Sequence, residues 1–114
     1  MAGNGLYETD LLTRAAPPCT GPGQEVYLPT VNRDASRRPV LTIQDPNWSN
    51  LVTGYNVYRA PAPAGPWTKI ATNAKDSDPG TPGIQYVDPN GGGTATWYYL
   101  VAAFNGGCGL EGPW

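Results

Sequence analysis

Proline and glycine interrupt this chain so often that a long helix has no room to form. The 114 residues include 13 prolines and 15 glycines. Each proline removes a backbone hydrogen-bond donor and fixes φ, and glycine weakens the interior of a helix. Between these breaks lie short runs of β-branched and aromatic residues, which are typical of strands. The chain is therefore expected to be all-β, either a sandwich or a small barrel.

The densest run is Thr96–Asn105, which is bracketed by Gly91–Gly93 before it and Gly106–Gly107 after it. Glycines on both sides predict that this strand begins and ends in turns. Side chains alternate along a strand, so one face is expected to carry Trp97, Tyr99, Val101 and Ala103. That row is expected to face the core. The opposite face is also apolar, which indicates that something covers part of it.

Weaker patterns predict five further strands. Together with the dense run, the expected strands are residues 25–31, 39–44, 52–59, 67–71, 84–88 and 96–104. Pro29 predicts that the first of them lies at an edge or a bulge. Residues 1–24 form an N-terminal arm and a linker rich in proline and glycine, and the folded domain is expected over residues 25–114.

Charge and hydropathy exclude two classes of partner. The net charge is −2 with only seven basic residues, so no electrostatic footprint for nucleic acid is present. No window is long and apolar enough for insertion into a membrane, and the first residues lack the pattern of a secretion signal. Such a chain fits a virion protein made in a host cytosol, or one whose numbering begins after processing or inside a longer protein.

Residues that could carry chemistry are sparse. The chain has no histidine, and its two cysteines do not form a CxxC pair, so neither a metal site nor a cofactor is expected. The serines lie in polar segments and are interpreted as turn residues. Three aspartates are interpreted as solvated loop acids, with a weak calcium site as the alternative; they are Asp76, Asp78 and Asp88. An enzyme is not expected.

Four segments together resemble a fibronectin type III domain. They are Thr53–Arg59, Gly65–Ala71, Tyr86–Asp88 and Thr96–Asn105, which look like its strands C, C′, E and F in the right order. The resemblance covers roughly residues 25 to 110. It implies an immunoglobulin-like β-sandwich of a three-stranded and a four-stranded sheet in Greek-key order. It also implies a binding or spacing role, since such domains are rarely enzymes.

The chain departs from the family pattern at two core positions. Ile43 stands where the second strand usually carries a tryptophan, so Trp48 or Trp67 is expected to fill that volume. The tyrosine that ties strand F to the preceding loop in this family is matched here to Trp97. An indole donates one hydrogen bond and accepts none, and so could only partly replace it.

A third departure concerns the last strand, G. The segment Gly106–Trp114 is interpreted as a loop, which would leave strand F with an unpaired acceptor edge at Tyr99, Val101 and Ala103. The N-terminal arm looks like a G strand placed before its domain. Its expected assembly residues are Leu6, Tyr7, Thr9, Leu11, Leu12 and Thr13. If residues 6–14 of one copy fill the edge of the next, the product is a head-to-tail chain.

Three alternatives to this strand donation remain open. The arm could pack on its own domain, it could be a disordered tail, or Leu110–Trp114 could form a stunted G strand. The cysteines also leave alternatives open. In the fold that the resemblance implies, Cys19 and Cys108 lie at the same end, where a disulfide is reasonable and would indicate an oxidising location. Two free thiols or an intermolecular bridge are the other readings.

Two functions follow from these patterns. The first is a structural subunit of a virion or an extracellular surface fibre, whose partners are further copies of itself and other virion or surface proteins. The second is a binding or spacer module of a larger secreted enzyme or adhesin. For the second, flat aromatic side chains are the candidate surface. They are Trp48, Trp67, Tyr58, Tyr98 and Trp114.

Overall fold

The computed structural model describes residues 20–114, and this part of the chain contains strands and one short 3₁₀ turn. The elements are β1 (Tyr27–Arg33), β2 (Pro39–Gln44), η1 (Ser49–Leu51), β3 (Gly54–Ala60), β4 (Thr68–Ala74), β5 (Ile84–Val87), β6 (Tyr98–Asn105) and β7 (Leu110–Glu111). The all-β expectation is confirmed. No helix in residues 20–114 is long and apolar enough to cross a membrane.

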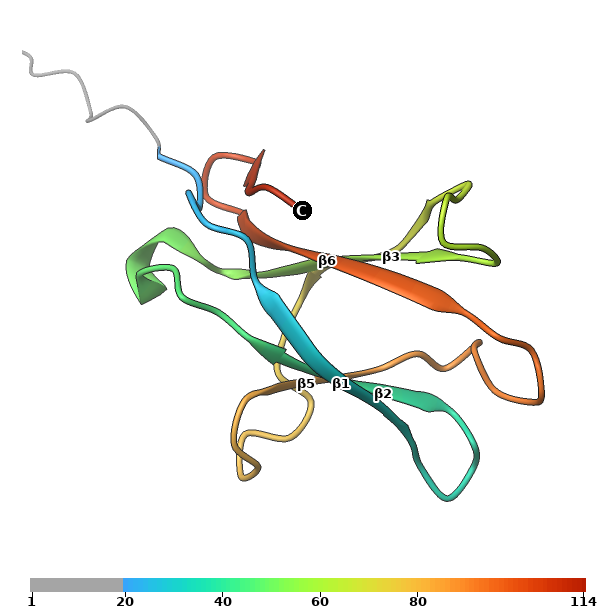
Figure 1. Ribbon diagram of the computed structural model, residues 1–114. Helices are drawn as coiled ribbons and strands as arrows, with labels where there is room; N and C mark the ends of the chain where they lie inside the picture. The colour runs from blue at the N-terminus through green and yellow to red at the C-terminus, as the bar shows by residue number, and fades with distance from the viewer. Residues whose placement is uncertain (1–19) are drawn as a thin grey trace, which may run out of the picture.

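The strands form two antiparallel sheets. One has three strands in the order β1-β2-β5, and the other has four in the order β4-β3-β6-β7. Figure 1 shows them as two layers, with β3 and β6 in one and β1, β2 and β5 in the other. The longest pairing joins β3 to β6, in register from Gly54 opposite Phe104 to Ala60 opposite Tyr98. The centre of the larger sheet is therefore the run that is densest in aromatic residues.

The six expected strands are all present, and five of them have shifted ends. β2 has the expected bounds, because Leu41 and Ile43 alternate cleanly into the core. β4 continues three residues beyond its expected end, to Ala74, since its pairing with β3 accommodates two register shifts. β1 also contains a register shift, between Tyr27 and Thr30, in the segment where Pro29 predicted a bulge.

The interpretation of Gly106–Trp114 as a loop is wrong at two residues. Leu110 and Glu111 form β7, which pairs with Asn105 and Phe104 of β6. A tight turn returns the chain here, with the amide of Cys108 donating to the carbonyl of Asn105. Gly109 has a positive φ of 68°, a conformation that glycine adopts without strain. A short last strand, one of the alternatives left open by the sequence, is what the structure contains.

The core lies between the sheets. Its buried cluster is Leu41, Ile43, Tyr55, Val57, Val101 and Ala103. Val101 and Ala103 therefore face inward as the alternation predicted. The expectation that Trp48 or Trp67 fills the space beside Ile43 is wrong, because neither belongs to this cluster and Trp48 is 77% exposed. Tyr55, which comes from the opposite sheet, supplies the buried aromatic ring.

A buried carboxylate ties the two sheets together at one end. Asp88 is 1% exposed, and its Oδ2 accepts hydrogen bonds from Arg59 of β3 and Tyr99 of β6, both at 2.8 Å. Its own amide donates to the carbonyl of Pro39 in the other sheet. The interpretation of Asp88 as a solvated loop acid is therefore wrong. Burial of this charge is tolerated because it is paired and hydrogen-bonded.

The residue that ties β6 to the preceding loop is Tyr99, so its assignment to Trp97 is wrong. The ring of Trp97 instead lies under the guanidinium of Arg59, 4.4 Å from its Cζ. Burial and then the hydrogen bond to Asp88 raise the pKa of Tyr99 well above its usual range. Gly91 closes the loop over this group, where a Cβ would lie 2.6 Å from the Asp88 carboxylate. Only glycine fits there.

We predict that Tyr99→Phe lowers the free energy of unfolding by about 1–3 kcal/mol, because it removes a hydrogen bond to a buried charged group. Tyr98→Phe is the matched control, since the neighbouring residue is 38% exposed and faces the other side of the sheet. Urea denaturation of both variants measures the difference. Equal stability of the two variants would show that the Tyr99–Asp88 bond contributes nothing.

Candidate functional site

Two hollows in the described part of the chain could bind a partner. One is a cleft of about 310 Å³ at the end of the sandwich where the β2–β3 and β4–β5 loops meet. The other is a smaller groove of about 120 Å³ beside β6. Within residues 20–114, no group of three or more acidic or cysteine side chains gathers to hold a metal ion.

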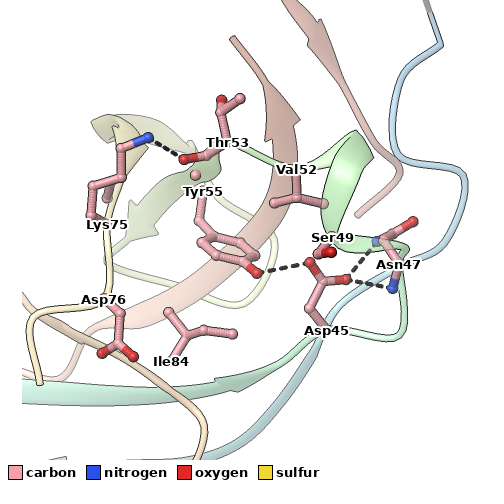
Figure 2. A pocket seen from close by; sticks show the side chains of 11 residues that line it. Asp45, Asn47, Ser49, Val52, Thr53, Tyr55, Lys75, Asp76 and Ile84 are labelled. Carbon is pink, nitrogen blue, oxygen red and sulfur yellow. Dashed lines mark hydrogen bonds between the residues drawn. The ribbon is translucent and has the colours of Figure 1, made fainter. Parts of the chain in front are cut away.

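Polar side chains of the larger cleft form hydrogen bonds with one another and with nearby backbone groups. Figure 2 shows the hydroxyl of Tyr55 pointing at Asp45, to which it donates at 2.8 Å. The second carboxylate oxygen of Asp45 accepts from the backbone amide and the side-chain amide of Asn47, at 2.8 and 2.6 Å. Asn47 in turn exchanges two 2.9 Å hydrogen bonds with the backbone of Gln24. Burial and then Asp45 raise the pKa of Tyr55 far above its usual range.

The other wall of the cleft is braced in the same way. The ammonium of Lys75 donates to the carbonyl of Thr53 (Figure 2). One oxygen of Asp76 accepts from the amides of Asp78 and Gln85, at 2.9 and 3.0 Å, which shapes the β4–β5 loop. These polar groups hold loops in place. The larger cleft is therefore interpreted as a structural region, because most of the polar side chains named here are already hydrogen-bonded within the protein.

The second hollow lies beside backbone groups of β6 that have no partner in residues 20–114. On β6, the carbonyl of Phe104 accepts from Thr53 on the β3 side, and the carbonyl of Ala103 accepts from Gly112 on the β7 side. Successive residues of a strand direct their backbone groups to opposite sides. The backbone groups of Val101 and Tyr99 therefore point to the same side as those of Ala103.

On that side the neighbouring strand, β7, is much shorter than β6. β7 pairs only with Phe104 and Asn105, and within residues 20–114 no backbone group pairs with Tyr99 or Val101 there. These two positions form the open edge of β6. Of the three residues predicted for the acceptor edge, two are open, whereas Ala103 is already bound by Gly112. An open edge is a template for an incoming strand.

The groove beside this edge is mostly apolar. Its lining comes from the segment entering β1, from β6 and from the C-terminal residue: Glu25, Val26, Leu28, Tyr99, Leu100, Val101 and Trp114. We call it the edge groove. Val26 and Leu28 are partly buried side chains packed against the core, so the groove is continuous with it. An incoming strand would therefore meet both unpaired backbone groups and an apolar wall.

The C-terminal residues cover the outer face of the same sheet. The carboxylate of Glu111 accepts from Asn56 at 2.7 Å, from Tyr58 at 2.5 Å and from the indole of Trp114 at 2.9 Å. The ring of Trp114 stacks on Tyr58 with centroids 5.0 Å apart. The expected cover over the second face of β6 is thus supplied from β7 and the residues after it.

Hydrogen bonding at Glu111 changes the acidity of two groups. Partial burial acts to raise the pKa of Glu111, but the donors of Asn56, Tyr58 and Trp114 outweigh it and hold the pKa below its usual range. Burial and then Glu111 raise the pKa of Tyr58 to about 12. Both shifts favour the pair of a carboxylate and a neutral phenol.

The predicted surface aromatics do not form one platform in the described residues. Tyr58 and Trp114 contact each other, and the ammonium of Lys69 lies 5.8 Å from the Tyr58 ring. Trp48 is 77% exposed at the opposite end of β3, beside η1. Trp67 is half-buried and Tyr98 is exposed, and no ring contact joins them to the stacked pair.

Several predicted residues lie outside the described part of the chain. They are Cys19 and the arm residues Leu6, Tyr7, Thr9, Leu11, Leu12 and Thr13. Cys108 is disulfide-bonded. The side-chain amide of Asn105 donates to the carbonyl of Thr20, so the segment that follows Cys19 runs close to the β6–β7 turn. The pairing of Cys19 with Cys108 remains a prediction.

Sequence reasoning missed Glu111, Val26 and Leu28. The glycines at 106, 107 and 109 mark a turn before Leu110, and this signal could have predicted the short hairpin. The contact of Glu111 with Asn56 joins residues 55 apart in the chain, and no local pattern encodes it.

Comparisons with protein-family models, curated proteins and solved structures found no match to this chain. The open edge and the edge groove are therefore judged on their own geometry.

We predict that the stability contributed by Glu111 is lost in acid. Because its pKa is lower in the folded than in the unfolded chain, its contribution is present above the unfolded pKa of about 4.3 and fades as pH falls through the folded value. Glu111→Gln, which cannot titrate, should therefore lose less stability than the wild type between neutral pH and acid.

Urea midpoints measured across that range test the prediction, with Glu25→Gln as the control at an exposed carboxylate. Parallel curves for the wild type and Glu111→Gln would contradict it.

Proposed function

We propose that this chain is a non-enzymatic structural subunit that self-assembles head to tail by β-strand complementation, as a virion component or an extracellular surface fibre. The sheet orders β1-β2-β5 and β4-β3-β6-β7 support the resemblance to a fibronectin type III-like Greek key. In that arrangement β7 corresponds to strand G, here reduced to Leu110 and Glu111.

The observation that carries the proposal is the open edge of β6. Tyr99 and Val101 direct backbone groups toward the edge groove that are unpaired within residues 20–114, and groups of this kind gain hydrogen bonds when a strand is added. The apolar wall formed by Val26 and Leu28 adds a hydrophobic contribution. Backbone pairing and an apolar groove together suit an extended segment better than a compact ligand.

The segment that best fits this edge is the N-terminal arm of another copy. Residues 6–14 read as an isolated strand, and the proline-rich linker that follows can span from one subunit to the next. A strand donated by one copy to the next makes a heterologous contact, which propagates as an open chain when the rotation between copies does not close a ring. The disulfide at Cys108 supports an oxidising location, such as a cell surface or a mature virion.

The alternative function is a binding or spacer module of a larger secreted enzyme or adhesin. Exposed aromatic surface favours it, namely the half-exposed Trp114 stacked on Tyr58 and the 77% exposed Trp48. Flat aromatic rings bind partners at low entropic cost. In that case the open edge would be occupied by another part of the larger protein.

Size-exclusion chromatography with light scattering tests the assembly. We predict that the full chain forms species whose mean mass rises with concentration, and that a version lacking residues 1–16 is monomeric. The elements and core described above lie within residues 20–114, so this deletion leaves them intact. A synthetic peptide of residues 1–18 should cap the full-length chains and shorten them.

A peptide of the same composition in scrambled order is the control for capping. Monomeric full-length protein at all concentrations would overturn the proposal and favour the binding module. Assembly that survives the deletion would also overturn it, because the arm would then not be the donor.

A further inference from the structure

We infer that the donated arm docks on β6 with one defined face inward, so that Tyr7, Thr9 and Leu11 enter the edge groove while Glu8 and Asp10 face away from it. This inference rests on the proposed strand complementation and specifies how the partner is recognised. It predicts that the same substitution has different effects on assembly at neighbouring arm residues, even at two identical ones such as Leu11 and Leu12.

The inward face of the edge follows from the orientation of β6. Val101 belongs to the buried core, and Tyr99 reaches Asp88 between the sheets, so both side chains point inward. In an antiparallel pair, residues directly opposite each other place their side chains on the same face of the sheet. Arm residues opposite Tyr99 and Val101 must therefore also point inward, toward Val26 and Leu28.

Charge selects which set of arm residues takes those positions. Alternation divides the arm into Tyr7, Thr9, Leu11 and Thr13 on one face and Leu6, Glu8, Asp10 and Leu12 on the other. The second set would place two carboxylates against an apolar wall. Glu25 is the only charged residue of the edge groove and is itself acidic, so no cation of the lining would compensate them. The first set carries no charge.

The position of the donor along β6 is limited at one end. The carbonyl of Ala103 is already bound to the amide of Gly112, and β7 occupies Phe104 and Asn105. The added strand is therefore restricted to Tyr99, Val101 and the residues before them. A shift of the donor by two residues keeps the same face inward, whereas a shift by one exchanges the faces. The choice of face is thus independent of the exact register.

Matched substitutions in the full chain test the inference. Leu11→Asp and Leu12→Asp introduce the same charge at neighbouring positions, and Tyr7→Asp and Leu6→Asp form a second pair. We expect the inward variants, at 11 and 7, to raise the concentration of half-assembly by about 10- to 100-fold, from lost apolar burial and a buried charge. The outward variants should change it by less than about threefold.

Thermal unfolding of each variant in its dilute state serves as the folding control. If the wild type assembles through its arm but both members of each pair weaken assembly equally, the choice of face is wrong and the proposed function stands. A stronger effect at 12 and 6 than at 11 and 7 would reverse the assignment. A wild type that stays monomeric would overturn the proposed function and this inference together.

Discussion

The pairing of β6 determines both the stability of this protein and its open edge. On one side, β6 pairs with β3 from Tyr98 to Phe104. On the other side, β7 covers only its last two residues. Because backbone groups of a strand alternate between its two sides, one strand can be fully integrated into the core and still present Tyr99 and Val101 to a partner. Tyr99 and Val101 therefore pack their side chains in or against the core, while their backbone groups on the β7 side have no partner within residues 20–114.

Groups around β6 fix this edge in position. Asp88 connects Tyr99 to Arg59 at one end of the strand, and the β6–β7 turn is held at the other end by Asn105 and Cys108. On the outer face, Glu111 gathers Asn56, Tyr58 and Trp114. A rigid edge loses little conformational entropy when it binds, so most of the cost of strand addition falls on the incoming arm. This division suits a scaffold whose partner is an extended segment.

The sequence predicted the strands better than it predicted the contacts between them. β2 was predicted at both ends because its apolar residues alternate, and the dense aromatic run was recognised as β6. β7 was only an alternative to a loop, because two residues between glycines carry little strand pattern. Asp88 was misread because its partners, Arg59 and Tyr99, lie 29 and 11 residues away and only the fold brings them together. The open edge could be anticipated, but the edge groove depends on Leu28 of β1, in the other sheet, and on Val26 just before that strand.

Residue-resolved amide hydrogen exchange of the full chain, dilute and then assembled, tests strand addition at β6 most directly. The amides of Leu100 and Ala102 face β3 and should be protected in both states. Those of Tyr99 and Val101 should exchange faster than these neighbours in the dilute state, then slow by at least about tenfold on assembly, as new ladder bonds form. Unchanged exchange at Tyr99 and Val101 on assembly would contradict strand addition at this edge.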